Sequence, residues 1–165
     1  MEKWQVYIQE ALSQVEFAKR CYALYRKALE RRSDVTEIFL QVHHFVVHAS
    51  NIDKIIDAKP GSDRATILGN CIDFTGVNLK PFRRLRNHLE HFDERLDMWV
   101  ANYDGHAFLD MNLVTGSKGF PKKAFLRALD GDAFKFHGED YSLTELYTEI
   151  LKIEKLLSEA EKHVS

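Results

Sequence analysis

Apolar residues that recur at the period of an α-helix run through most of this chain and limit the folds open to it. Residues 3 to 31 carry one such stripe, and residues 35 to 58 carry a second. Ser33 and Asp34, followed by Glu37, supply N-cap chemistry at the start of the second stripe. Amphipathic helices of this length bury their apolar sides against other helices, so the pattern favours a helical bundle.

Two further helices are predicted later in the chain. One runs from Pro81 to Tyr103, with Pro81 in the first turn, where a missing N–H costs nothing. The other opens at Ser142 to Glu145, a capping-box pattern, and residues 62 to 75 predict a short helix or turn between the second and third long helices. We therefore expect a mainly α protein built as a four-helix bundle. The predicted core side of the third helix consists of Leu85, Leu89, Phe92, Leu96, Trp99 and Val100.

Between about residues 106 and 138 the apolar period changes from helical to alternating. Leu109 to Leu113, Phe125 to Leu129 and Phe134 to His137 are apolar runs separated by turn sequences. The pattern predicts a small antiparallel meander of two or three strands, inserted before the last helix. An isolated ribbon is marginally stable in water, so its Phe and Leu face is expected to pack on the helices or on another chain.

Composition indicates one domain over residues 1–165, since 45% apolar content is enough for a core. The net charge of −2 argues against broad electrostatic binding to nucleic acid, so any RNA contact has to be local and DNA is not expected. The N-terminus lacks the apolar run of a signal peptide, and no stretch approaches the ~20 apolar residues of a membrane span. Cys21 and Cys71 make neither a disulfide framework nor a metal-ligand spacing. We expect a cytoplasmic protein with no membrane partner and no cofactor.

The polar side of the third helix carries the spacing in this sequence that most suggests chemistry, Arg86-Asn87-His88-Leu89-Glu90-His91. Arg86 and His91 are about 140° apart around a helix and about 7.5 Å apart along it, so they bracket an arc that a ligand or a partner helix could cover. This run resembles the HEPN family, small helical domains marked by an Arg, often followed by Asn, with a His four to six residues later. The resemblance extends over residues 1 to 103 and 142 to 165.

In HEPN ribonucleases, the resemblance implies, two protomers pair so that their Arg and His residues line one cleft and cut RNA without a metal. The ribose 2′-OH then attacks the adjacent phosphate. The expected catalytic residues are Arg86, Asn87 and His91, with His91 of each protomer as base and acid and Arg86 on the phosphate. His88, Glu90 and Arg83 are expected to contact substrate. The expected partners are a second copy of the chain and RNA or a nucleotide.

Three other interpretations remain open. Arg86 to Glu90 and His91 to Arg95 are also the spacings of ion pairs on a solvated helix, and those residues are then not catalytic. A HEPN-like module that binds a nucleotide or a protein without cleaving anything uses the same residues. His43, His44 and His48 suggest a metal-binding bundle, although a stable site needs a further ligand that local spacing does not mark.

Overall fold

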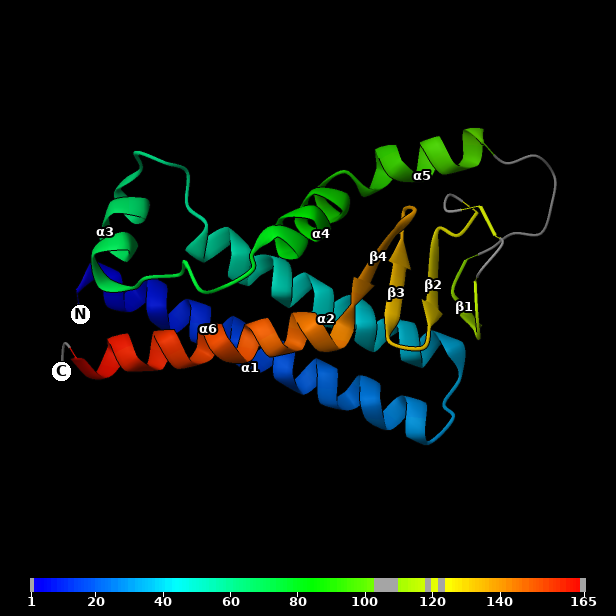
Figure 1. Cartoon of the computed structure of the whole chain (residues 1–165), viewed down its shortest axis with the longest axis horizontal. Coiled ribbons are helices and arrows are strands. Elements are labelled where there is room, and N and C mark those ends of the chain that lie inside the picture. The colour runs from blue at the N-terminus through cyan, green and yellow to red at the C-terminus, as the bar shows by residue number, and fades with distance from the viewer. Residues whose placement is uncertain (1, 103–109, 118–119, 122–123, 164–165) are drawn as a thin grey trace.

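The computed structural model describes residues 2–102, 110–117, 120–121 and 124–163. These residues form six helices and a sheet of four strands, with the sheet inserted before the last helix. Three long helices, α1 (Lys3–Glu30), α2 (Val35–Ile56) and α6 (Leu143–His163), run along the molecule, and the sheet lies at the end opposite α3 (Asp63–Cys71) (Figure 1). The mainly helical character and the position of the strands agree with the sequence prediction. Within the described residues, no helix is both long enough and apolar enough to cross a membrane.

The first two helices form an antiparallel hairpin. α1 spans Lys3–Glu30 and α2 spans Val35–Ile56, and the carboxylate of Asp34 accepts a hydrogen bond of 3.0 Å from the backbone N–H of Glu37. The predicted cap of the second helix is therefore confirmed. The fully buried residues of α2 carry the centre of the core, because their side chains face α1 on one side and α4 on the other. They include Val42, Phe45, Val46, Ala49 and Ile52.

The predicted helix from Pro81 to Tyr103 is two helices. α3 (Asp63–Cys71) precedes α4 (Lys80–Glu90), which ends at His91, and α5 (Phe92–Ala101) follows; Tyr103 itself lies outside the described residues. The backbone of His91, at φ −115° and ψ 35°, is not helical. The stripe predicted for one straight helix therefore turns away from the core at this point, and Val100 is 53% exposed.

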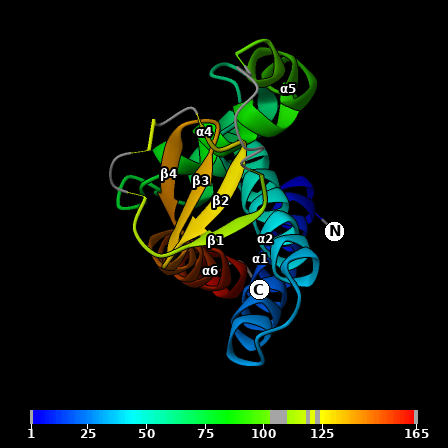
Figure 2. The same ribbon diagram turned by 90° about the vertical axis from the view of Figure 1, so that its right-hand side faces the viewer.

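The sheet consists of β1 (Asn112–Val114), β2 (Arg127–Asp130), β3 (Ala133–Phe136) and β4 (Glu139–Ser142), in that order (Figure 2). β2, β3 and β4 pair antiparallel through tight turns, as the predicted meander of two or three strands requires. β1 adds a fourth strand that pairs parallel with β2, and the sequence did not predict that pairing. The connection over 115–126 is long enough to return the chain to the same end of the sheet, as parallel pairing requires.

One face of the sheet joins the helical core. Phe134 and Phe136 are completely buried and Leu129 is nearly so, as expected from the alternation in the sequence. The last helix, α6 (Leu143–His163), starts directly after β4, and Ser142 accepts a hydrogen bond from the N–H of Glu145 as its pattern predicted. Asp132, in the turn between β2 and β3, also accepts hydrogen bonds from Ser142 and Thr144. The sheet is therefore fixed to the start of α6.

Candidate functional site

The predicted motif is distributed around α4. Residues three or four apart share one side of a helix, so Arg83, Arg86 and Glu90 form one side. His88 lies on another side and is buried at 8% exposure. Asn87 and His91 are exposed between these two sides. The motif therefore divides into two flanks of α4, the Arg86 side and the His88 side, with Asn87 and His91 exposed to solvent between them.

Arg83, Arg86 and Glu90 line a groove of about 660 Å³ between α4, the end of α2 and the start of α3. Each of them has an ion-pair partner on α2 or directly after it. Arg86 Nη1 lies 2.9 Å from Asp53 Oδ2, Arg83 Nη2 lies 2.6 Å from Asp57 Oδ2, and Lys54 Nζ lies 2.9 Å from Glu90 Oε1. The ion pair expected between Arg86 and Glu90 is not formed, because both residues reach across to α2 instead.

The partner of Arg86 is a buried carboxylate. Asp53 is completely buried, and neither of its oxygens has a hydrogen bond of good geometry among the described residues. Burial raises the pKa of Asp53 to about 6, while the nearby Arg86 guanidinium opposes that rise. Arg86 is thus the main positive charge against a desolvated carboxyl group, and only 24% of its side chain is exposed. Arg86 is therefore paired with a buried residue of α2, and not with Glu90 on the surface of its own helix.

His91 and Asn87 have few contacts. The ring of His91 is 47% exposed, and its Nδ1 atom lies 3.4 Å from Glu94 Oε1, so the predicted partner Arg95 is replaced by the residue one position earlier. His91 ends α4, where its backbone N–H donates to the carbonyl of Asn87. His91 is not among the residues that line the groove holding Arg86. Within one chain, the expected catalytic Arg and His therefore face different surroundings.

His88 lines a separate cavity of about 260 Å³ on the other flank of α4. The ring of His137, from the turn between β3 and β4, stacks on that of His88 with centroids 5.6 Å apart and planes 22° apart. Glu139 Oε2 lies 3.8 Å from His88 Nε2 and accepts a hydrogen bond of 2.9 Å from the Tyr141 hydroxyl. The remaining lining residues come from α5, its end and the loop before β2, namely Arg95, Met98, Trp99, Asn102 and Phe125.

Burial disfavours the charged form of both cavity histidines. Burial, together with the neighbouring His88, Arg95 and Arg127, lowers the pKa of His137 to about 4. Burial also lowers the pKa of His88, although the Glu139 carboxylate opposes that effect. His88 Nδ1 and His137 Nε2 are buried without a hydrogen-bond partner among the described residues. A neutral imidazole with an unpaired nitrogen can accept a proton, and the lowered pKa of His137 makes it a weaker base than a free imidazole.

Sequence reasoning included His88 only as a substrate contact and missed His137, Glu139 and Arg95. Residues 134 to 137 were assigned to a strand on their alternation, which placed Phe134 and Phe136 correctly. His137 instead adopts a left-handed backbone at φ 52° in the β3–β4 turn, and that turn aims the chain back toward α4. The signal that could have found it is the His-Gly-Glu run, since a polar turn after an apolar strand presents its side chains at the edge of the sheet.

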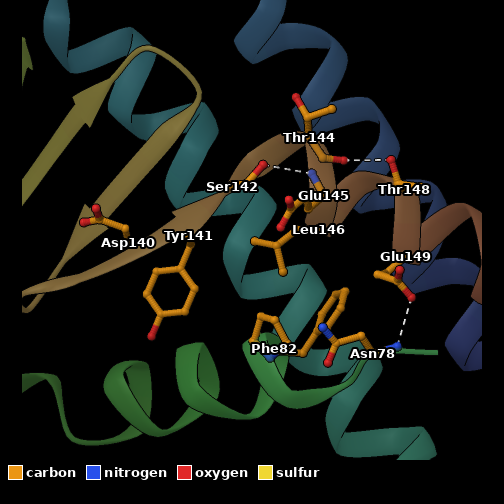
Figure 3. Close-up of a pocket in the computed structure, with 11 residues that line it drawn as sticks. Asn78, Phe82, Asp140, Tyr141, Ser142, Thr144, Glu145, Leu146, Thr148 and Glu149 are labelled. Atoms are coloured by element: carbon orange, nitrogen blue, oxygen red, sulfur yellow. Dashed lines mark hydrogen bonds between the residues drawn. The ribbon is translucent and has the colours of Figure 1, made fainter. Parts of the chain in front are cut away.

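A third pocket, of about 350 Å³, lies where α4, β4 and α6 meet (Figure 3). Phe82, Leu146 and the ring of Tyr141 form its apolar walls. The carboxylate of Glu149 accepts a hydrogen bond of 2.9 Å from the backbone N–H of Asn78, which ties the start of α4 to α6. Among the described residues, no histidine, cysteine, lysine or arginine lines this pocket. Its polar groups hold α4 and α6 together, as the hydrogen bond between Asn78 and Glu149 does, and do not form a set typical of a catalytic site.

The histidines of α2 do not assemble a metal site. No group of three or more His, Cys, Asp or Glu side chains within the described part of the chain is placed to hold a metal ion. His48 Nδ1 lies 2.9 Å from the side-chain oxygen of Gln14, and its ring packs against Phe17. Burial lowers the pKa of His43 and His48. His48 therefore contributes to the contact between α1 and α2.

A scan of protein-family models finds no match to this chain, and comparisons with curated proteins and with solved structures find none either. The functional proposal therefore depends on the geometry of the two flanks of α4 and on the resemblance carried by residues 86 to 91.

Proposed function

We propose that this chain is a HEPN-like, metal-independent ribonuclease in which His88 and His137 form the acid–base pair. The observation that carries the proposal is the stacking of these two rings at 5.6 Å in one cavity. Arg95 in the same cavity supplies a guanidinium for a phosphate. The resemblance at Arg86 to His91 supplies the substrate class, RNA, and the two imidazoles supply chemistry suited to it.

The reaction follows from the residues that line the cavity. His137, kept neutral by its surroundings, takes the proton of the ribose 2′-OH as the 2′-oxygen bonds to phosphorus. The bond from phosphorus to the 5′-oxygen breaks, and His88 donates a proton to that oxygen. The Glu139 carboxylate and the substrate phosphate favour the charged form of His88, because both are negative. Arg95 pairs with the non-bridging oxygens, where charge grows. The products are a 2′,3′-cyclic phosphate and a 5′-hydroxyl.

The proposed fold core is the four-helix set α1, α2, α4 and α6, in the HEPN-like arrangement that the sequence suggested. In this proposal the sheet is more than a cover, because the β3–β4 turn delivers His137 and Glu139 to the side of α4. The proposed setting is the cytoplasm, and the proposed partners are RNA and a second copy of the chain.

The test is cleavage of mixed RNA by purified protein in the presence of EDTA. His88→Asn and His137→Asn should each lower the rate about a hundredfold or more, since a positioned acid or base contributes about 10²–10⁴-fold. Asparagine is chosen because it tolerates the left-handed backbone of His137. His44→Asn, at an exposed position on α2, is the matched control and should leave the rate unchanged.

His91→Asn separates the two possible sites on α4. Full activity of His91→Asn supports the cavity as the catalytic site. If His91→Asn is inactive and His137→Asn keeps full activity, catalysis belongs to the predicted Arg86 and His91 instead. Thermal unfolding of each variant shows whether an inactive protein is still folded.

One observation favours a second candidate, a non-catalytic HEPN-like module that binds a nucleotide or a protein. Arg86 is engaged by the buried Asp53, so the residue expected to stabilise the transition state already has a structural partner. Under this alternative, wild-type protein binds RNA or a nucleotide in a filter assay but cleaves no RNA pool, with or without added metal.

A further inference from the structure

The groove on the Arg86 side of α4 has more positive than negative side chains. Two carboxylates, Asp57 and Glu90, line it, and the buried carboxylate of Asp53 lies against Arg86. Counting those three acids, the groove keeps two uncompensated positive charges. The basic residues that line it are Lys54, Lys59, Arg64, Arg83 and Arg86.

The excess charge belongs to two residues. Lys54, Arg83 and Arg86 each have a carboxylate within 3 Å. Lys59 is exposed and has no partner among the described residues, and Arg64 has no carboxylate partner there. Both lie on the segment that leads from α2 into α3, so they face α4 across the groove.

The unused donors are of the kind that bind an oxyanion. Arg64 Nη2 donates to the carbonyl of Lys54 at 3.0 Å, and its Nε–H is buried without a partner. Arg83 gives two donors, Nε and Nη2, to a single oxygen of Asp57, which leaves the rest of its planar fork unpaired within the described contacts. Arg64 also offsets the negative end of α2, which otherwise disfavours an anion there. A ligand oxygen in the groove thus finds guanidinium N–H groups and the Lys59 ammonium.

We propose that this groove is a binding site for a phosphate group, with Lys59 and Arg64 as its principal ligands and Arg83 beside them. The two uncompensated charges match a doubly charged phosphate monoester. A guanidinium fork on a phosphate forms charge-assisted hydrogen bonds that are stronger than those between neutral groups. The site is separate from the His88 cavity, and it does not require that the protein cleave RNA.

The test measures binding by isothermal titration calorimetry with inorganic phosphate and with two short RNAs, one carrying a 5′-phosphate and one a 5′-hydroxyl. Wild-type protein should bind inorganic phosphate saturably and should bind the 5′-phosphorylated RNA more tightly than the other. The pair Lys59→Gln and Arg64→Gln should weaken both about tenfold or more, corresponding to about 1.4 kcal/mol.

The matched control is the pair Lys27→Gln and Arg31→Gln at the exposed end of α1, which changes the net charge equally and should leave binding within about twofold. Lys59→Gln alone is the variant that keeps the fold, since its side chain makes no described contact. If both RNAs bind equally tightly, and the Lys59→Gln and Arg64→Gln pair weakens the binding of both, the site binds a phosphate of the RNA backbone and not the 5′-phosphate. Absence of saturable binding, or equal loss in the control pair, would overturn the proposal.

Discussion

Asp53 is a carboxyl group with no exposed surface, and Arg86 is the positive charge that compensates it most, with a smaller contribution from Arg83. Taking such a group out of water costs several kcal/mol unless it is paired and hydrogen-bonded. Here the pairing is incomplete, since neither oxygen has a well-formed hydrogen bond among the described residues. The result is a carboxyl group whose ionisation opposes folding at neutral pH.

This gives a pH-dependent prediction for Asp53→Asn. The pKa of Asp53 is about 6 in the folded protein against 3.8 for an ordinary aspartate, so the folded state holds the proton more tightly than the unfolded chain. The wild-type free energy of unfolding, relative to that of Asp53→Asn, should therefore fall as pH rises from about 4 to about 6. The fall should be at most about 3 kcal/mol, at about 1.4 kcal/mol per pKa unit.

Urea unfolding of both proteins at a series of pH values measures that difference. A difference that stays constant across this window, or that grows as pH rises, would show that Arg86 compensates Asp53 fully.

At the same scale, the sequence singled out residues of α4 but did not predict their contacts. Arg86 and His88 were singled out because of their spacing, whereas their partners Asp53 and His137 lie on elements that are distant in the chain. Spacing along a helix predicts which side chains share a side, and it says nothing of which other element covers that side. The pairing of Arg86 with Asp53 and the stacking of His137 on His88 could therefore be found only from the three-dimensional structure.

Among the elements, long helices were predictable and the details of the junctions were not. The stripes of α1, α2 and α6 and the caps at Asp34 and Ser142 were predicted from local signals, because a helix face and a cap depend on neighbours within a few residues. The break at His91 has no Pro or Gly to mark it. The parallel pairing of β1 depends on how the connection over 115–126 runs, which a local pattern does not encode.

The break makes a testable difference between α4 and α5. Leu85 is completely buried, so Leu85→Ala should lower the free energy of unfolding by about 2–5 kcal/mol. Val100 was predicted to share that core side, but it is 53% exposed, and Val100→Ala should change stability by less than about 0.5 kcal/mol. Urea unfolding monitored by circular dichroism compares the two. Similar losses for both variants would mean that another surface covers the apolar side of α5.

Across the whole molecule, the joint between helices and sheet shapes the His88 cavity as well as stabilising the fold. The core is continuous from α1 through α2 to Phe134 and Phe136, and Phe136 lies against His88 with ring centroids 5.6 Å apart. The packing that stabilises the sheet therefore also positions the cavity.

The last prediction concerns whether two copies are needed. A HEPN-type cleft takes one histidine from each protomer, so its specific activity falls when the protein is diluted until dimers dissociate. The cavity proposed here holds both imidazoles within one chain. Specific ribonuclease activity should therefore stay constant on dilution, even where light scattering shows dimers turning into monomers. Activity that follows the dimer fraction, and that mixing His88→Asn with His137→Asn protein restores, would place the two histidines on different protomers.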